Sequence, residues 1–225
     1  GWTSSEGIND LAREEGSQVV VSWMHPSSPD AQKGSSFTTT LTSHAFELPN
    51  VSTSLDDGVG YIRLRQISQN SADLVQEAVA SLTAEGATAF VLDIRDNPGG
   101  YLTQAVDIAC LFVQSGVIVE VETADGTTPK SATGTTITNA PLVVLANDYT
   151  SAAAEVLAAG LQGNQRATVV GQTTRGKGSV QVTRELTFGG GVRYTAAYYL
   201  TPLGASIDGV GVVPNVSLVS SDDSD

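Results

Sequence analysis

The sequence predicts an α/β fold with a largely buried sheet. From residue 60 onward, strand-sized segments rich in Val, Ile and Leu alternate with segments whose apolar residues recur at the helical period. This alternation is typical of sheets packed against helices. The chain has 225 residues, of which 40% are hydrophobic, so it can bury a substantial core. We expect one large domain preceded by a fragment of a second.

The first 43 residues predict a small separate segment. A short helix is expected to begin at Ser4 or Ser5 and to end at Gly16, and strands are expected at residues 18–24 and 37–42, which are rich in Val and Thr. We therefore predict a first segment over residues 1–43, a core domain over residues 44–218, and a disordered acidic tail over residues 219–225.

The sequence of the core domain predicts a regular succession of strands and helices. Strands are expected at residues 61–65, 89–94, 117–121, 141–146 and 192–200. One helix presents Leu74, Ala78, Val79 and Leu82 on its apolar face, a second covers residues 102–113, and a third begins at residue 150 and carries Ala152. Residues 122–139 are polar and rich in Gly and Thr, which predicts a surface excursion.

Charge and composition exclude several function classes. The net charge is -13 and the chain has only 11 Lys and Arg, which argues against nucleic-acid binding because phosphates need clustered cations. The apolar runs are too short for a membrane span. The single Cys110 is expected in the core, without a disulfide.

Histidine and metal chemistry have little support in the sequence. His25 and His44 have no His or Cys at ligand spacing, so no metal site and no cofactor are predicted. The chain also lacks the G-x-S-x-G elbow of a Ser-His-Asp hydrolase. If this chain catalyses hydrolysis, its base must be something other than histidine.

Lys177 is the candidate base because it lies between Gly176 and Gly178 in a loop that follows a predicted strand. A lysine can take the proton of a serine hydroxyl when burial favours its neutral amine. The two glycines allow a positive φ and a close backbone approach, which would deliver the amine into a cleft. We expect this amine to be held away from water, opposite the start of the helix that carries position 152.

Several separate motifs occur along residues 1–218. They are Asp93-Ile94-Arg95-Asp96-Asn97-Pro98-Gly99-Gly100, Thr150-Ser151-Ala152-Ala153-Ala154-Glu155, residues 171–181, Thr201-Pro202-Leu203-Gly204 and Gly209-Val210-Gly211-Val212-Val213-Pro214-Asn215. In this order, the motifs resemble those of the C-terminal processing peptidases, also called tail-specific proteases. The resemblance implies a crotonase-like (ClpP/crotonase-type) spiral of ββα units, preceded by the second half of a PDZ-like domain.

The resemblance also implies the roles of individual residues. It makes Lys177 the general base, Gln181 its orienting partner, and Glu155 a supporting carboxylate. It places the oxyanion hole at the backbone N–H groups of Gly100 and Ala153.

The nucleophile position of that family falls on Ala152, where a serine is usual. An engineered Ser-to-Ala change and a naturally decayed site both account for this alanine, and either would lower activity by about six orders of magnitude. Ser151 is not expected to substitute for it, because neighbouring helical positions differ by about 100° in direction and its hydroxyl should therefore point away from Lys177. For Arg95 and Asp96, we expect a structural role in the turn rather than catalysis.

Three functions remain open from the sequence. The first is a serine endopeptidase that cleaves proteins near their C-termini. The second is a natural non-catalytic binding protein on the same scaffold, for a peptide or an apolar ligand. The third is an acyl-processing enzyme of the crotonase-like group. The resemblance implies protein or peptide substrates with C-terminal tails, a possible homo-oligomer, and a location outside the cytoplasm: periplasmic, secreted or in a plastid lumen.

Overall fold

The computed structural model describes residues 16–26, 34–43 and 49–218, and the chain divides into two units, Gly1–Leu48 and Pro49–Asp225. The helix predicted from Ser4 or Ser5, residue His44 and the predicted acidic tail lie outside the described residues.

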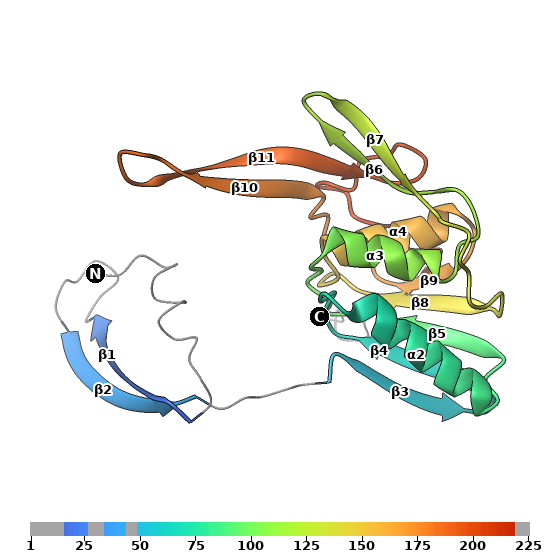
Figure 1. Cartoon of the computed structure of the whole chain (residues 1–225), viewed down its shortest axis with the longest axis horizontal. Coiled ribbons are helices and arrows are strands. Elements are labelled where there is room, and N and C mark those ends of the chain that lie inside the picture. Colours follow the sequence, from blue (N-terminus) through green and yellow to red (C-terminus); the bar gives the residue numbers. More distant parts are fainter. Residues whose placement is uncertain (1–15, 27–33, 44–48, 219–225) are drawn as a thin grey trace, which may run out of the picture. The chain divides into compact units, whose positions relative to one another are not determined.

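The described part of the first unit is a β-hairpin. Strand β1 (Gln18–Pro26) pairs antiparallel with β2 (Gly34–Thr42), from Gln18 opposite Thr42 to Pro26 opposite Gly34 (Figure 1). Both strands were predicted, and both extend beyond the predicted bounds. Their Val and Thr residues favour an extended backbone.

The second unit is built on a six-stranded sheet in the order β12-β9-β8-β5-β4-β3. Its members are β3 (Val51–Asp56), β4 (Val59–Leu64), β5 (Ala89–Asp93), β8 (Leu142–Ala146), β9 (Thr168–Gly171) and β12 (Val216–Ser217). Neighbouring strands are parallel except for β3, which pairs antiparallel with β4. The mostly parallel sheet agrees with the predicted α/β class.

The described residues of this unit also form three helices: α2 (Ser71–Ala84), α3 (Leu102–Cys110) and α4 (Ala153–Gly163). Helix α3 packs against both α2 and α4 (Figure 1). Alternate strand residues such as Phe90, Leu92 and Val144 are buried in the core. Helix α4 is buried over most of its length. Gly160 allows it to lie close to the strand that contains Ile118, because a Cβ at Gly160 would lie 2.7 Å from Cγ2 of Ile118. Cys110 is a buried free thiol, as predicted.

A second sheet has the order β10-β11-β6-β7. Its strands are β6 (Val117–Thr123), β7 (Gly126–Ser131), β10 (Ser179–Glu185) and β11 (Gly191–Leu200). Strand β6 pairs with β11 only from Tyr198 to Leu200, so most of the β10–β11 hairpin extends away from the core (Figure 1).

The surface excursion predicted over residues 122–139 contains a strand, β7, that the sequence did not indicate. This strand forms a tight hairpin with β6, and its polar residues suit an edge strand whose residues are all exposed. Its Pro129 is tolerated because an edge strand has one side without ladder bonds.

In the part of the chain that the structure describes, no helix is long and apolar enough to cross a membrane. No group of three His, Cys, Asp or Glu residues able to hold a metal ion occurs among the described residues either.

Candidate active site

The loops that follow β5 and β8 meet because the two strands are parallel neighbours, with Asp93 opposite Leu145. Loops at the carboxyl ends of such strands commonly form sites in open α/β sheets. The β8 loop, from Asn147 to Ala152, leads into α4, and the β5 loop leads into α3. These are the two strand-to-helix connections that carry the predicted motifs.

Asp93 anchors the β5 loop from inside the protein. Its carboxylate is fully buried and forms ion pairs of 2.6 Å with Nη1 of Arg63 and with Nη2 of Arg95. Burial opposes its ionisation, yet hydrogen bonds from Arg95 and from the Tyr61 hydroxyl, with the charge of Arg63, hold the pKa of Asp93 below its ordinary value. Arg95 thus has the structural contacts predicted for it.

Asp96 joins the two loops through a reciprocal pair of hydrogen bonds with Asn147. The Asp96 N–H donates to Oδ1 of Asn147 (2.9 Å), and Nδ2 of Asn147 donates to Oδ1 of Asp96 (2.8 Å). The Ser151 N–H also donates to the Asn97 carbonyl (2.9 Å). These bonds set the position of the residues that precede α4.

Ala152 occupies a strained turn between β8 and α4. Its φ of 54° and ψ of -122° lie outside the backbone regions that residues other than glycine ordinarily adopt. It is the N-cap residue of α4. The prediction that Ala152 lies within the helix was wrong, so the argument from helical spacing does not apply to Ser151. Strain of this kind costs about 1–3 kcal/mol and gathers at functional sites, where a sharp strand-to-helix turn can expose a nucleophile.

Glu155 connects the Ala152 turn to the loop of Lys177. Its carboxylate is fully buried in the first turn of α4. Its two oxygens accept four hydrogen bonds: Oε1 from the Thr174 hydroxyl and the Gly176 N–H (2.7 Å), and Oε2 from the N–H groups of Ala152 (2.9 Å) and Lys177 (2.8 Å). The backbones of positions 152 and 177 therefore meet at one oxygen atom.

The two glycines around Lys177 have the backbone geometry predicted for them, a positive φ and a close approach. Gly176 takes a φ of 76°, and Gly178 packs so closely that a Cβ would lie 2.3 Å from the Asp208 nitrogen. The Gly178 N–H donates to Oδ1 of Asp208 (3.1 Å). The loop is thus held on one side by Glu155 and on the other by the segment that contains Asp208.

The predicted oxyanion-hole residues lie at the starts of two helices. Gly99 contacts the Ala152 turn directly, because a Cβ at Gly99 would lie 2.9 Å from the Ala152 Cβ and 2.8 Å from the Ala153 nitrogen. Among the described residues, the N–H groups of Gly100 and Ala153 have no backbone or side-chain acceptor. Free N–H groups at a helix start can stabilise a developing oxyanion.

The structure differs from the sequence prediction at the side chains of Lys177 and Gln181. Lys177 is exposed, so its amine is not held away from water as expected, because the residues that the structure describes do not cover it. Gln181 donates through Nε2 to the Thr195 hydroxyl (2.7 Å) and to the Ser179 hydroxyl (3.4 Å), and both partners lie within its own hairpin. Its side chain is therefore engaged by β11 rather than by Lys177.

Two residues at this site were missed by sequence reasoning. Thr174 is buried, and its hydroxyl donates to Glu155 while accepting from the Val212 N–H (2.8 Å). Asp208 holds the Gly178 backbone. The only signal in the sequence was indirect: a carboxylate at the buried start of a helix requires donors, and Thr174 lies in the adjoining motif.

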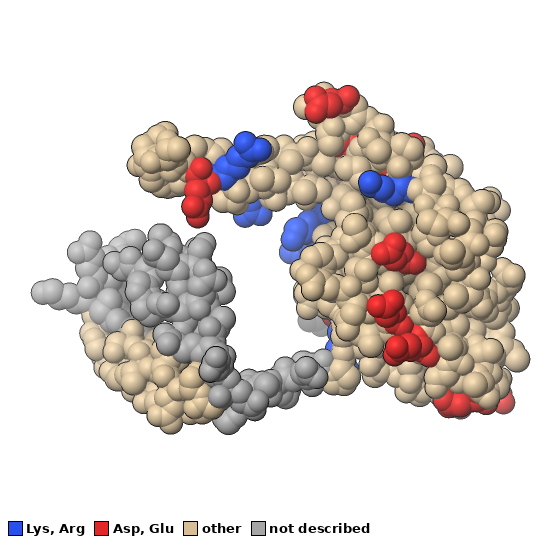
Figure 2. All heavy atoms as spheres, in the orientation of Figure 1, with Lys and Arg blue, Asp and Glu red and all other residues tan. Residues whose placement is uncertain are grey.

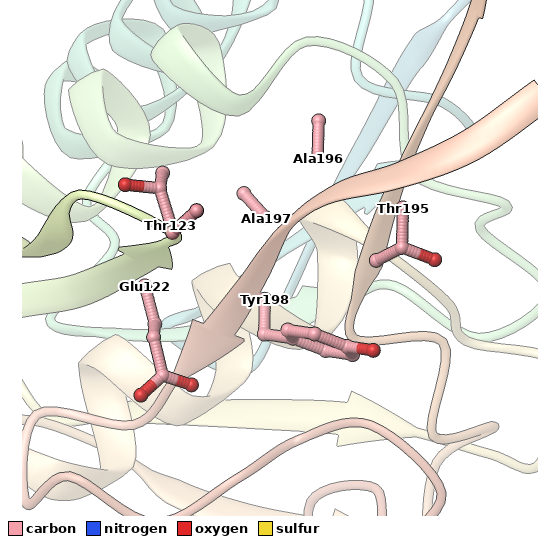
Figure 3. A pocket seen from close by; sticks show the side chains of 7 residues that line it. Glu122, Thr123, Thr195, Ala196, Ala197 and Tyr198 are labelled. Atoms are coloured by element: carbon pink, nitrogen blue, oxygen red, sulfur yellow. The ribbon is translucent and has the colours of Figure 1, made fainter.

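A hollow of about 350 Å³ lies where β6 diverges from β11. It is lined by Glu122, Thr123, Ala124, Thr195, Ala196, Ala197 and Tyr198. Figure 3 shows Glu122 and Tyr198 pointing to the same side of the sheet, as expected for cross-strand neighbours. Thr195, which lines this hollow, is also the hydroxyl partner of Gln181.

Comparison with known proteins identifies relatives of this chain. Residues 58–218 match the model of peptidase family S41. The chain is 43% identical over 182 residues to a carboxyl-terminal-processing protease of Synechocystis sp., and this match covers 78% of the chain and 43% of the relative. It is 39% identical over 184 residues to carboxyl-terminal-processing peptidase 2, chloroplastic, of Arabidopsis thaliana, which covers 80% of the chain and 36% of that relative.

A solved structure titled photosystem II D1 C-terminal processing protease matches with a TM-score of 0.72 at 33% identity, over 96% of this chain and 59% of that one. The chain thus spans less than half the length of these two curated relatives. Since the family model matches well over half of its residues, the chain belongs to peptidase family S41 and is related to the carboxyl-terminal-processing proteases.

Proposed function

We propose that this chain carries the catalytic core of a serine-type endopeptidase that cleaves proteins near their C-termini, with Ala152 in place of the nucleophile. One observation carries the proposal: a single oxygen of Glu155 accepts from the backbone N–H groups of both Ala152 and Lys177. This arrangement holds the backbones of the nucleophile position and the base position next to each other, although helix α4 and strand β9 separate them in the sequence.

The chemistry assigns one role to each group. With serine at position 152, Lys177 takes the hydroxyl proton as the oxygen attacks the peptide carbonyl. The N–H groups of Gly100 and Ala153 stabilise the tetrahedral oxyanion. The proton then passes to the leaving amine, and water hydrolyses the acyl-enzyme by the same route. The strained φ and ψ of Ala152 support this assignment, because they expose the side chain at the tip of the turn.

Because Lys177 is exposed, its amine must lose contact with water before it can act as a base. We propose that the bound peptide covers the amine and excludes water, which favours its neutral form only when substrate is present. Strand β10 begins two residues after Lys177 and is the outermost strand of its sheet among the described residues, so a peptide can add to its free edge as a further strand.

A natural non-catalytic binding protein is the second candidate, and the exposed Lys177 together with Ala152 favours it. On either function, we propose that the β1–β2 hairpin is the second half of a PDZ-like domain and that the core is a crotonase-like spiral. By relationship to the chloroplastic and cyanobacterial proteins, we also propose a location outside the cytoplasm, periplasmic, secreted or lumenal.

Restoring the nucleophile tests the proposal. The Ala152→Ser chain should cleave an unfolded protein substrate and should be labelled at position 152 by a serine-directed fluorophosphonate. Adding Lys177→Ala should abolish both activities, whereas adding Lys130→Ala, at an exposed lysine of β7, should change neither. A folded Ala152→Ser chain that neither cleaves nor reacts would support the binding protein instead. Cleavage that persists in the Lys177→Ala variant would refute the dyad.

A further inference from the structure

Four of the six Lys and Arg side chains without a partner among residues 49–218 lie in one segment beside the candidate site. The segment from Arg175 to Arg193 contains four Lys or Arg and one acid, whereas the rest of residues 49–218 contains five Lys or Arg and fourteen Asp or Glu. Residues 49–218 are therefore acidic except where the candidate base and the β10–β11 hairpin lie. In Figure 2, Lys and Arg with one acidic residue lie on the hairpin and beside its base, and Asp and Glu form several separate patches elsewhere.

The other cations of this unit are mostly engaged inside it. Arg63 and Arg95 pair with Asp93, and Arg166 donates to the carbonyls of Phe112, Thr138 and Ala140. In contrast, the side chains of Arg184 and Arg193 are exposed and have no hydrogen bond or ion pair with any described residue. Glu185, the one acid of the segment, forms no ion pair with the described residues either.

The pairing of the hairpin puts these two arginines at successive levels and on opposite faces. Arg193 lies opposite Thr183, and Arg184 follows Thr183 in the same strand, so the two side chains point to opposite sides of the hairpin. Thr183 is short, which leaves the guanidinium of Arg193 free to reach across it toward the outer edge of β10. A peptide strand at that edge also directs its successive side chains to alternate faces.

Because the arrangement matches two successive side chains of an added strand, we infer that Arg184 and Arg193 select substrates with two adjacent acidic residues at a fixed distance from the scissile bond. The inference rests on the proposed peptidase function and names its substrate class. Arg184 lies seven residues beyond Lys177, about 23 Å along an extended chain at about 3.3 Å per residue. The acidic pair is thus expected about seven residues from the scissile bond.

Charge selects for this class in two ways. An acidic segment meets repulsion from most of the surface and attraction from the hairpin, which guides it to the edge of β10. Each exposed guanidinium then pairs with one carboxylate. Since both pairs are exposed, we expect a preference of about five-fold at low ionic strength, which falls toward one as salt screens the charges.

Matched peptides test the inference in the Ala152→Ser chain. A fluorogenic peptide that this chain cleaves is extended on either side with Asp-Asp or with Asn-Asn, seven residues from the scissile bond. We expect kcat/KM to be about five-fold higher for one of the Asp-Asp peptides than for its Asn-Asn counterpart, and the ratio to approach one in about 0.5 M salt.

Two double variants complete the design. Arg184→Gln with Arg193→Gln should reduce the Asp-to-Asn ratio to about one, whereas Arg65→Gln with Lys130→Gln, which removes the same charge elsewhere, should preserve it. An Asp-to-Asn ratio of one in the parent chain, or a ratio that survives the hairpin substitutions, would overturn the inference. Failure of the parent chain to cleave any peptide would instead refute the proposed function.

Discussion

Replacing Glu155 by Gln should strongly destabilise the protein, because no orientation of an amide reproduces the contacts of the carboxylate. The two oxygens of Glu155 accept from three backbone N–H groups and one hydroxyl in a fully buried site. A glutamine has one oxygen, so its NH2 group must replace one of the two carboxylate oxygens. If the NH2 group replaces Oε1, the Gly176 N–H lacks an acceptor. If it replaces Oε2, the N–H groups of both Ala152 and Lys177 lack one.

The magnitude follows from the number of donors. A buried donor without a partner costs about 1–3 kcal/mol, so Glu155→Gln should lower the free energy of unfolding by about 1–6 kcal/mol, depending on the orientation of the amide. This is a large part of the 5–15 kcal/mol that is typical of a domain. Urea denaturation of the chain as it stands, with Ala152, measures the change without interference from self-cleavage.

Thr174→Val is the matched comparison for this measurement. It removes one donor to Glu155 and leaves only the Val212 N–H without an acceptor, so its cost should be about 1–3 kcal/mol. Because both side chains belong to one network, the double variant should cost less than the sum of the single variants. A Glu155→Gln chain with an unfolding free energy within about 0.5 kcal/mol of the parent, a change usual for an uninvolved surface site, would refute the reasoning.

Gly99→Ala should unfold at a lower urea concentration than Gly86→Ala, since both glycines have positive φ but only Gly99 has atoms within 3 Å of a Cβ; equal midpoints would contradict the crowding argument. Asp93 has a lowered pKa when folded, so its carboxylate stabilises the fold above about pH 4, and this contribution is lost as the pH falls through the folded value. Urea midpoints at pH 6 and pH 3 should therefore differ less in Asp93→Asn than in the parent, and an unchanged difference would argue against this source of acid sensitivity. Thr195→Val should release the Gln181 side chain, because it removes the hydroxyl that accepts from Gln181. In the serine-restored chain we expect kcat for peptide cleavage to rise by about two- to ten-fold, which corresponds to the free energy of one modest hydrogen bond. An unchanged kcat would show that this contact does not restrain the site.

The elements of the core were predictable where local patterns are strong. The helix over Ser71–Ala84 has a clear apolar face, and the buried strands at Ala89–Asp93 and Leu142–Ala146 are continuous apolar runs. Strand β7 was not predictable in this way, because its polar sequence resembles a loop and becomes a strand only by pairing with β6. Edge strands depend on their partner more than on their own side chains.

The candidate site likewise has features that the sequence predicted and features that depend on tertiary contacts. The family resemblance grouped Ala152, Glu155 and Lys177 as candidate site residues, and the glycines at 176 and 178 indicated a constrained loop. Sequence periodicity placed Ala152 inside α4, whereas it lies in a strained turn before the helix. Local propensity cannot reveal that strain, because it is sustained by tertiary contacts with the neighbouring loop.

Residue order and type were sufficient to indicate an α/β core, its family and a group of candidate site residues. Whether those residues act together depended on tertiary contacts: one carboxylate of Glu155 joins two distant backbones, Thr195 engages Gln181, and Lys177 is left exposed. The physical reason is that hydrogen bonds and burial are determined by the groups that surround a side chain in space, and most of those groups come from elsewhere in the chain.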